Sequence, residues 1–423
     1  MKLRLDLWRK KDKEMRETVI DEAKRCLQCK NPRCKEGCPI HTPIRDAIGL
    51  LRNNQIKEAG ELLFENNPLS IICSLVCPQE KQCEGHCVLG IRGIPVPVGM
   101  IENYISDYYL NLFEAGEIKR NGKKVAIVGS GPAGITISIL LARKGYEVTL
   151  FEARDKIGGI LRYGIPAFRL PKDVLDRLKE VLLKMGVKIR PNTNIGANLT
   201  IDDLFRDGYK SIFLGTGVWK PYKLGIEGES LGNCCYAIEY LQNPDVYDLG
   251  KKLIVIGGGN TAMDVARTAL RHGVKEVEIL FHRTKEELTA RKIEVDYTLM
   301  DGAVIKELTQ TKKIVDNGVV VNDVKVLEDG SYVEDESSTH LLEADNVIIA
   351  IGQGPRSVIV NSTKGVETTD RGLLSVDEVG RTSRAGLFAA GDVVTGAKTV
   401  VQAVRLSKEV AEAMDQYMSA LSE

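Results

Sequence analysis

The sequence predicts an α/β protein in which a helical, cysteine-rich region, residues 1–118, precedes two Rossmann-like nucleotide-binding domains. Three observations carry this prediction. Two glycine-rich turns, beginning at Gly129 and Gly257, each stand between a short apolar strand and a helix. Eight of the ten cysteines fall between Cys26 and Cys87. A chain of 423 residues is also too long for a single hydrophobic core, so two or three domains are expected.

The overall composition is that of a globular protein with no strong electrostatic preference. Hydrophobic residues make up 43% and charged residues 27% of the chain, and 58 Lys and Arg balance 58 Asp and Glu. Zero net charge gives no overall field that would draw the chain to nucleic acid or to a membrane surface. The N-terminal stretch MKLRLDLWRKKDKEM lacks the apolar core of an export signal, and no apolar run is long enough for a membrane span. We therefore expect a cytoplasmic protein without nucleic-acid binding or membrane insertion.

The N-terminal region is predicted to be mainly helical, with loops that carry the cysteines. Aromatic residues and β-branched alternation are scarce there, and apolar residues recur at helical spacing. The predicted helices are Glu14–Lys24, Thr42–Arg52, Gln55–Glu65 and Met100–Phe113. The stretch 114–122 is the predicted linker to the first nucleotide-binding unit.

The first glycine-rich turn has the form of a dinucleotide-binding loop. A buried strand is expected at Val125–Val128, the turn GSGPAG follows at once, and a helix begins at Pro132, whose missing N–H costs nothing there. Gly129 makes the tight turn, Gly131 lets a pyrophosphate approach the backbone, and Gly134 lets helix and strand pack closely. The N–H groups at the helix N-terminus then favour a bound phosphate.

A second strand, Val148–Phe151, completes this βαβ unit and ends at Glu152. An acidic side chain at this position can accept a hydrogen bond from a ribose 2′-hydroxyl. Strand, turn, helix, strand and terminal acid in register indicate dinucleotide binding far more strongly than the glycine pattern alone. A purely structural loop is the weaker alternative.

The same pattern begins again in the middle of the chain. A strand at Leu253–Ile256, a turn GGGNTA and a helix reaching His272 precede a strand at Val277–Phe281. Two such units in one chain indicate two dinucleotides bound in neighbouring domains. Further strands of the second unit are expected at 319–327 and 346–350.

No acidic residue ends the last strand of this repeated pattern, because His282 and Arg283 stand there instead. A guanidinium can pair with the 2′-phosphate of NADPH, whereas a carboxylate would repel it, so NADPH is favoured over NADH. Glu286 and Glu287 weaken this preference, and Arg291 is either a further contact or a surface charge.

The clustered cysteines have the spacing of metal ligands rather than of disulfides. The two groups are Cys26-x2-Cys29-x4-Cys34-x3-Cys38-Pro39 and Cys73-x3-Cys77-Pro78-x4-Cys83-x3-Cys87. Close spacings with Cys-Pro are typical of iron–sulfur proteins, whereas zinc sites more often use two CxxC pairs. We therefore expect two [4Fe-4S] clusters, with structural zinc as the alternative. Spacing alone would assign four consecutive cysteines to each cluster.

Six motifs in order resemble those of a known group of flavin and iron–sulfur oxidoreductases. They are CLQCKNPRCKEGCPIHTPI, NPLSIICSLVCPQEKQCEGHC, AIVGSGPAG, YGIPAFRLPKDVLD, VIGGGNTAMDVARTA and FAAGDVVTGAKTVVQAV. Over nearly its whole length the chain is similar to the small subunit of bacterial glutamate synthase. It is also similar to the N-terminal half of dihydropyrimidine dehydrogenase and to the separate flavin subunit of the bacterial enzyme. The large subunit of the ferredoxin-linked NADH–NADPH transhydrogenase belongs to the same group.

The resemblance implies FAD at the first unit, NAD(P)H at the second, and two [4Fe-4S] clusters with interleaved ligands. It assigns one cluster to Cys26, Cys29, Cys34 and Cys87, and the other to Cys38, Cys77, Cys83 and Glu102. Glu102 lies on the predicted helix that follows the cysteines, and its alternative role is that of a solvated surface carboxylate. Because the chain also contains Cys73, an all-cysteine second site stays open.

The resemblance also implies a discontinuous FAD-binding domain, residues 119–220 and 353–423, with an NAD(P)H-binding domain, residues 221–352, inserted between its two parts. The second part holds a strand at 387–390 and a last helix at 399–421. The residues expected to contact FAD are Gly129, Gly131, Pro132, Ala133, Gly134, Glu152, Gly159, Arg169, Gly391, Asp392 and Thr399. The residues expected to contact NAD(P)H are Gly258, Gly259, Asn260, Thr261, His282, Arg283 and Gly352.

The expected function is that of an electron-input subunit, which oxidises NAD(P)H with FAD and passes electrons through the clusters to a partner subunit. Hydride transfer between cofactors needs position and electrostatics, so no catalytic side chain is expected. Cys234 and Cys235 are adjacent rather than spaced as CxxC, which favours core residues over a redox disulfide. The alternatives are a subunit of a ferredoxin-linked transhydrogenase, with or without electron bifurcation, and a zinc-stabilised, nucleotide-sensing interaction protein without turnover.

Overall fold

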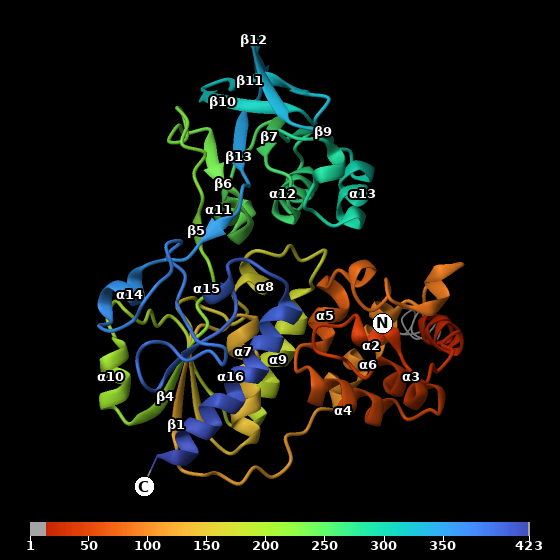
Figure 1. Ribbon diagram of the computed structural model, residues 1–423, viewed down its shortest axis with the longest axis vertical. Helices are drawn as coiled ribbons and strands as arrows, with labels where there is room; N and C mark the ends of the chain where they lie inside the picture. The colour runs from red at the N-terminus through yellow and green to blue at the C-terminus, as the bar shows by residue number, and fades with distance from the viewer. Residues whose placement is uncertain (1–13, 422–423) are drawn as a thin grey trace, which may run out of the picture. The chain divides into compact units, whose positions relative to one another are not determined.

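The computed structural model describes residues 14–421, which divide into two compact units (Figure 1). The first unit contains the described residues up to Gly159, residues 167–217 and those from Ser357 onward. The second unit contains residues 160–166 and 218–356. The chain therefore leaves the first nucleotide-binding domain and later returns to it, as the discontinuous arrangement requires.

The cysteine-rich region is helical, as predicted. Residues 14–24 form its first described helix. The helices that follow are α2 (Arg33–Glu36), α3 (Ile44–Arg52), α4 (Ile56–Asn66), α5 (Ser70–Val76) and α6 (Val98–Leu112), with 3₁₀ turns at Gln79–Lys81 and Val88–Ile91. The apolar faces of the first helix, α3, α4 and α6 meet in one core that includes Leu51, Leu63 and Ile101, and α5 packs against α6. The cysteine loops are thus held on a packed helical frame.

The first nucleotide-binding domain is built on a five-stranded parallel sheet in the order β15-β4-β1-β2-β3. The strands are β1 (Lys124–Val128), β2 (Glu147–Phe151), β3 (Lys188–Arg190), β4 (Tyr209–Leu214) and β15 (Leu387–Ala389). Central β1 pairs with both β2 and β4 and is buried from Val125 onward, as its continuous apolar run predicts.

The helices of this domain begin at recognisable start signals. They are α7 (Pro132–Arg143), α9 (Lys172–Lys184), α10 (Ile201–Arg206), α14 (Val358–Ser362), α15 (Asp392–Thr395) and α16 (Val400–Ala420). Pro132 occupies the first turn of α7, and a capping box joins Thr200 to Asp203 at the start of α10. The long C-terminal helix α16 packs along α7 (Figure 1), where the hydroxyl of Ser407 donates to the Ala133 carbonyl at 3.4 Å.

Direct contacts join the helical region to the nucleotide-binding domain within this unit. Arg177 of α9 forms an ion pair with Asp107 of α6 at 2.7 Å. Lys408 of α16 donates to the backbone oxygen of Asn66 at 2.9 Å. The cysteine loops and the first glycine-rich turn therefore belong to one packed body.

The second unit has its own five-stranded parallel sheet in the order β6-β13-β7-β8-β9. The strands are β6 (Cys234–Tyr236), β7 (Lys252–Ile256), β8 (Glu276–Leu280), β9 (Val304–Lys306) and β13 (Asn346–Ile349). The helices are α8 (Ile160–Tyr163), α11 (Ala237–Gln242), α12 (Asn260–Arg271) and α13 (Lys292–Met300), with 3₁₀ turns at Pro244–Val246 and Lys285–Glu287. The α/β class with two Rossmann-like domains is confirmed.

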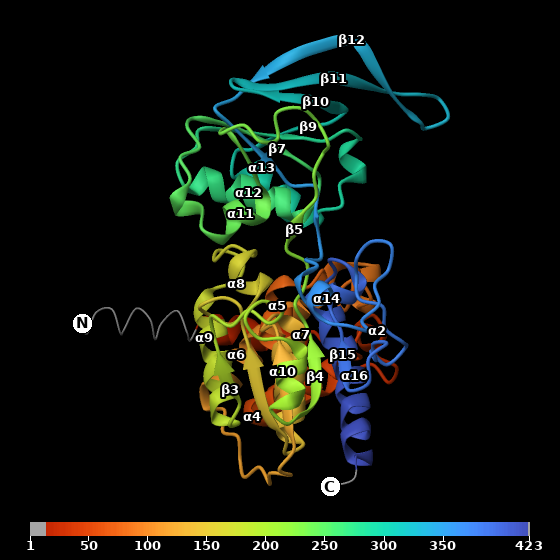
Figure 2. The same ribbon diagram turned by 90° about the vertical axis from the view of Figure 1, so that its left-hand side faces the viewer.

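One predicted strand of the second unit lies in a different sheet. The stretch 319–327 forms β11 (Gly318–Val326), which pairs antiparallel with β10 (Thr309–Val315) and β12 (Tyr332–Glu343) (Figure 2). Val319 and Val321 nevertheless pack into the same core as Ile254 of β7, so their apolar character does not distinguish the two sheets. A two-stranded antiparallel pair, β5 (Lys220–Pro221) with β14 (Gln353–Gly354), completes the unit.

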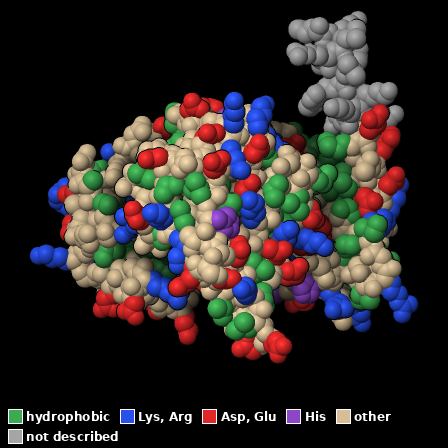
Figure 3. All heavy atoms as spheres, turned by 90° about the horizontal axis from the view of Figure 1, so that it is seen from above, with side chains coloured by type: hydrophobic (Ala, Val, Ile, Leu, Met, Phe, Trp, Pro, Cys, Tyr) green, Lys and Arg blue, Asp and Glu red, His purple; other side chains and the backbone are tan. Residues whose placement is uncertain are grey.

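Charges of both signs are interspersed over the face shown in Figure 3, in keeping with the equal totals of 58 basic and 58 acidic residues. Within residues 14–421, none of the helices combines the length and the apolar character that a membrane span requires.

Candidate functional site

The three glycines of the first turn meet the steric needs of a dinucleotide-binding loop. Gly129 has a φ of +97°, and a Cβ there would lie 2.6 Å from the carbonyl oxygen of Gly215. A Cβ on Gly134 would lie 1.8 Å from the Gly129 oxygen, so only glycine permits this approach of α7 to β1. A Cβ on Gly131, by contrast, would meet nothing within 4 Å. The backbone is therefore open where a pyrophosphate would approach the N-terminus of α7.

Gly159 closes this turn through backbone contact. The N–H of Gly158 donates to the Ser130 oxygen at 3.0 Å, and a Cβ on Gly159 would lie 2.8 Å from the Cα of Gly131. Gly159 also has a φ of +52°. The predicted contact residue thus shapes the glycine turn itself. Pro132 and Ala133 form the first turn of α7 beside it.

Glu152 bridges the end of β2 to the glycine turn. One carboxylate oxygen accepts from the Ser130 N–H at 3.1 Å and from the Ser130 hydroxyl, and the other accepts from the Arg154 N–H at 2.8 Å. The residue is only 6% exposed. A carboxylate has about four lone-pair sites, so these bonds leave acceptor capacity for a ribose hydroxyl.

The C-terminal segment returns to the start of α7. Gly391 has a φ of +78°, and a Cβ added to it would lie 3.1 Å from the Cβ of Ala133. Asp392 begins α15 and accepts from the Lys398 N–H at 3.2 Å, and burial raises the pKa of its carboxyl to about 6. Thr399 is the N-cap of α16, where the amide oxygen of Gln402 accepts from the Thr399 N–H at 3.1 Å. Arg169 lies half-buried in the segment before α9 of the same unit.

The second turn repeats the steric pattern of the first. Gly257 has a φ of +143°, and a Cβ there would lie 2.3 Å from the Ala350 oxygen. A Cβ on Gly258 would lie 2.5 Å from the ring of Phe281. Gly259 is open, because its nearest neighbour would be the Thr289 hydroxyl at 3.5 Å. Gly259 therefore corresponds to Gly131 as the point where a phosphate can approach, with Thr261 in the first turn of α12.

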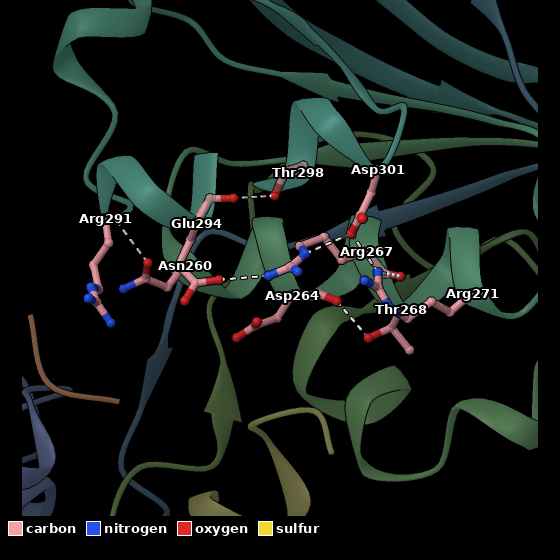
Figure 4. A network of polar contacts seen from close by, with 9 residues as sticks. All are labelled: Asn260, Asp264, Arg267, Thr268, Arg271, Arg291, Glu294, Thr298 and Asp301. Carbon is pink, nitrogen blue, oxygen red and sulfur yellow. Dashed lines mark hydrogen bonds and ion pairs between the residues drawn. The ribbon is translucent and has the colours of Figure 1, made fainter. Parts of the chain in front are cut away.

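A buried ion-pair network, which the sequence analysis missed, fastens α13 to α12 (Figure 4). Arg267 of α12 lies 2.9 Å from Glu294 of α13 and 2.8 Å from Asp301. Arg271 adds a second contact to Asp301 at 2.6 Å. The Arg267 and Glu294 side chains are 9% and 8% exposed, so removal of Arg267 would take the neutralising guanidinium away from a buried carboxylate.

Two hydrogen bonds hold the segment that leads into α13 against the second glycine-rich turn. The N–H of Ala290 donates to the Gly258 oxygen at 3.1 Å, and the N–H of Arg291 donates to the side-chain oxygen of Asn260 at 2.9 Å (Figure 4). The amide of Asn260, a predicted nucleotide contact, thus also holds the backbone of Arg291 beside the turn.

His282 and Arg283 stand beyond the end of β8, where the predicted phosphate contacts belong. Arg283 lies 3.2 Å from Glu287, and its guanidinium stacks 5.7 Å above the ring of Tyr332. Burial and the neighbouring guanidinium lower the pKa of His282. Gly352, with a φ of +103°, lies between β13 and β14. Its carbonyl oxygen accepts from the Tyr222 N–H at 3.1 Å.

The cysteines form two groups that do not follow the order of the chain. Cys26, Cys29, Cys34 and Cys87 line one cavity. Burial, with smaller contributions from the charges of Cys26 and Cys87, raises the pKa of the Cys34 thiol to about 11. The fold therefore places Cys87 with the first three cysteines, unlike the assignment of four consecutive cysteines suggested by spacing.

The second group surrounds Glu102. Burial raises the pKa values of Cys83 and Cys38, and the charge of Glu102 contributes to both and, after Cys73 and burial, to that of Cys77. The contact of Cys77 with Cys73 contributes most to the raised pKa of Cys77. Both candidate fourth ligands, Glu102 and Cys73, thus lie beside this group.

Glu102 is not a solvated surface carboxylate. Burial raises its pKa to about 7, and one carboxylate oxygen accepts from the Ser70 hydroxyl at 2.8 Å. The Ser70 hydroxyl also lies 2.8 Å from that of Ser106. The carboxylate is thus positioned from α6 toward the cysteines of the second group.

The donor sets fit iron–sulfur chemistry. Thiols with raised pKa values release their protons when they bind a cationic metal core, and thiolates are the usual ligands of iron–sulfur clusters. Among residues 14–421, no three His, Cys, Asp or Glu side chains converge closely enough to hold a single metal ion.

Cys234 and Cys235 alternate across β6. Cys234 packs against one hydrophobic core of the second unit and Cys235 against another, and both are free thiols. Their positions agree with the expected structural role.

Comparisons with known proteins agree with this geometry. Residues 90–203 and 123–407 match the family described as pyridine nucleotide-disulphide oxidoreductase. Residues 6–112 match the family described as dihydropyrimidine dehydrogenase domain II, 4Fe-4S cluster.

Curated relatives align over almost the whole chain. The glutamate synthase (NADPH) small chain of Escherichia coli strain K12 is 34% identical over 432 residues, covering 94% of this chain and 91% of the relative. The NAD-dependent dihydropyrimidine dehydrogenase subunit PreT of Salmonella typhimurium is 32% identical, covering 95% of this chain and 94% of the relative. Among solved structures, Mycobacterium tuberculosis FprA in complex with NADPH shares the fold at 17% identity, with a TM-score of 0.59 over 70% of this chain and 85% of that one.

Proposed function

Because this chain belongs to the pyridine nucleotide-disulphide oxidoreductase family and is related to the glutamate synthase small chains, we propose that it is the electron-input subunit of a larger oxidoreductase. It oxidises NAD(P)H with FAD and delivers electrons through two [4Fe-4S] clusters to a partner subunit that carries the substrate or acceptor site. The observation that carries this proposal is the packing of the cysteine-rich region and the first glycine-rich turn into one compact unit.

FAD, bound at the first turn, would supply the chemistry of accepting two electrons together and releasing them singly. The open backbone at Gly131 and the N-terminus of α7 would hold its pyrophosphate, and Glu152 would accept from its ribose. Asp392 and the N-terminus of α16 would face the remainder of the cofactor. The positive end of the α16 dipole favours negative charge there.

NADPH is the proposed electron donor at the second turn, with Arg283 as the contact to its 2′-phosphate. The ion pair of Arg283 with Glu287 is a surface pair, with side chains 50% and 37% exposed, and such pairs contribute little to stability. A phosphate can therefore displace the carboxylate at small cost and gain a bidentate contact.

We propose that Cys26, Cys29, Cys34 and Cys87 hold one cluster and that Cys38, Cys77, Cys83 and Glu102 hold the other. Replacement of Glu102 by alanine should make the second cluster labile or reduce it to three irons, whereas Glu102→Gln should retain it with a shifted potential. Cys73→Ser should leave both clusters intact. Loss of a cluster in Cys73→Ser, with none in Glu102→Ala, would instead support an all-cysteine site.

The function is tested by anaerobic reduction of the purified protein. Metal and flavin analysis should give about eight irons and one FAD per chain, as two [4Fe-4S] clusters require. Addition of NADPH should bleach the flavin absorbance and produce the electron paramagnetic resonance signals of reduced clusters. Zinc in place of iron, or a flavin that NADPH does not reduce, would overturn the proposal. Identification of a chain that copurifies from the native source would then separate a synthase-type partner from a transhydrogenase-type one.

A further inference from the structure

One exposed hydroxyl group faces the open side of the second glycine-rich turn. A Cβ on Gly259 would have the Thr289 hydroxyl oxygen as its nearest neighbour, at 3.5 Å. Thr289 is exposed, and its hydroxyl donates to the carbonyl oxygen of Gly258 at 3.4 Å. A hydrogen bond from a hydroxyl to an oxygen is usually about 2.7–2.8 Å long, so this contact is weak. A phosphate oxygen that enters beside Gly259 would offer the hydroxyl a better acceptor.

The residues on either side of Thr289 are anchored to the body of the second unit. Ala290 is buried in the core beneath the parallel sheet, and Leu288 packs against the same core. The N–H of Ala290 donates to the Gly258 oxygen at 3.1 Å, and a Cβ on Gly258 would lie 3.0 Å from the Leu288 side chain. The Thr289 hydroxyl is therefore held beside the turn before a nucleotide binds, and a preorganised donor loses little conformational freedom on binding.

The helix that follows Thr289 fastens the same segment a second time. Arg291 is the N-cap of α13, and its N–H donates to the side-chain oxygen of Asn260 at 2.9 Å (Figure 4). Three residues later, Glu294 forms the buried ion pair with Arg267 of α12 at 2.9 Å. The segment that carries Thr289 is thus joined directly to α12, the helix whose N-terminus would face the phosphates.

The position of Thr289 favours the pyrophosphate of the coenzyme over its 2′-phosphate. Gly259 is the N-cap of α12 and corresponds to Gly131, the point where a pyrophosphate approaches the backbone. The proposed partner of the 2′-phosphate, Arg283, stands beyond the end of β8. Because the pyrophosphate is common to NADPH and NADH, a contact from Thr289 should contribute equally to the binding of both.

We propose that Thr289 is a further nucleotide-binding residue, whose hydroxyl donates a hydrogen bond to the pyrophosphate of the bound coenzyme. The inference rests on the proposed function and adds a contact that sets the affinity for the coenzyme but not the choice between NADPH and NADH. On binding, the hydroxyl exchanges its long contact with the Gly258 oxygen for a bond to a charged phosphate oxygen. Bonds of that kind are shorter and about twice as strong as those between neutral groups.

The test measures the binding of NADP⁺ and of NAD⁺ to the full-length holoprotein by isothermal titration calorimetry. Thr289→Val removes the hydroxyl with little change of shape and should raise the dissociation constants of both coenzymes by the same factor, about tenfold. Thr289→Ser retains the hydroxyl and should bind both coenzymes almost as tightly as the wild type. Arg283→Ala, by contrast, should weaken the binding of NADP⁺ far more than that of NAD⁺.

A matched control removes an exposed threonine hydroxyl from the first unit. Thr368 is exposed and belongs to that unit, so Thr368→Val should bind both coenzymes like the wild type. The flavin content, the iron content and the midpoint of denaturant unfolding should match the wild type in all three threonine variants, because the Thr289 hydroxyl is exposed and makes only a long contact. Weaker binding at equal stability then separates a coenzyme contact from a structural role.

The outcomes distinguish this contact from the proposed function. Unchanged binding of both coenzymes in Thr289→Val would overturn the contact alone. So would a loss confined to NADP⁺, which would place the hydroxyl at the 2′-phosphate, or a loss that Thr289→Ser shares or that accompanies a lower unfolding midpoint. A wild-type holoprotein that binds neither NADP⁺ nor NAD⁺ would overturn the proposed function itself.

Discussion

Two glycines of the first turn should respond in opposite ways to the addition of a single methyl group. In Gly134→Ala, the new Cβ would lie 1.8 Å from the carbonyl oxygen of Gly129, a backbone atom that cannot swing aside. Overpacking of this kind costs about 1–3 kcal/mol and sometimes more, so we expect the free energy of unfolding to fall by about 3 kcal/mol. FAD should restore little of this loss, because the strain lies between β1 and α7.

In Gly131→Ala, the new methyl group meets no protein atom within 4 Å, and a φ of −71° is comfortable for alanine. The FAD-free protein should therefore unfold within about 1 kcal/mol of the wild type. The methyl group occupies the space of the pyrophosphate, however, and should weaken FAD binding by about ten- to a hundredfold, which corresponds to about 1.4–2.8 kcal/mol.

The assay combines denaturant unfolding of the FAD-free protein with titration of FAD by flavin fluorescence. The site assignment is wrong if Gly131→Ala binds FAD as tightly as the wild type. It is also wrong if the two variants lose equal stability without FAD, because the structure then misplaces the open side of the turn.

Three further predictions follow from the other contacts. Arg283→Ala should lower the ratio of kcat/KM for NADPH over NADH by about tenfold or more, since a charged hydrogen bond contributes about 1.5–3 kcal/mol; unchanged discrimination in steady-state kinetics would contradict the assignment. Arg267→Ala should lower the free energy of unfolding of the second unit by about 3–5 kcal/mol in denaturant titration, because the buried Glu294 carboxylate loses the guanidinium that neutralises it. Lys408→Met should shift the potential of the buried cluster to more negative values in a redox titration followed by electron paramagnetic resonance, because the ammonium of Lys408 interacts electrostatically with Cys38. Lys144→Met, which removes a lysine that binds the same helix α16 through surface carboxylates, should leave that potential unchanged.

The two nucleotide-binding units could be predicted from the sequence because their determinants are local. Tight turns, close helix–strand approach and an open phosphate side each require glycine at a fixed position, as Gly129, Gly131 and Gly134 show. Continuous apolar runs identified β1 and β7 as buried strands, and both are central strands of their sheets. The acid at position 152 followed from the same local pattern.

Local pattern did not distinguish the sheet to which a strand belongs. β11 has the apolar, β-branched character expected of a core strand, but it pairs antiparallel with β10 and β12. Pairing depends on which backbone lies alongside, and the side chains of β11 contribute to the same core in either sheet. The ion pairs of Arg267 could likewise not be predicted from the sequence, because its partners Glu294 and Asp301 lie on or just beyond another helix.

The sequence by itself indicated a cysteine-rich region that binds metal-type cofactors in a chain with two dinucleotide-binding patterns, because residue type and spacing carry that information. Spacing did not decide which cysteines meet: the family resemblance implied the grouping, and only the tertiary structure supplies the physical reason for it. Packing of α3, α4 and α6 around one core, with α5 against α6, brings Cys87 to Cys26 and Cys34, and brings Cys38 to Cys83 beside Glu102. Such convergence is set by long-range packing of helices, and spacing along the chain constrains only neighbours within a loop.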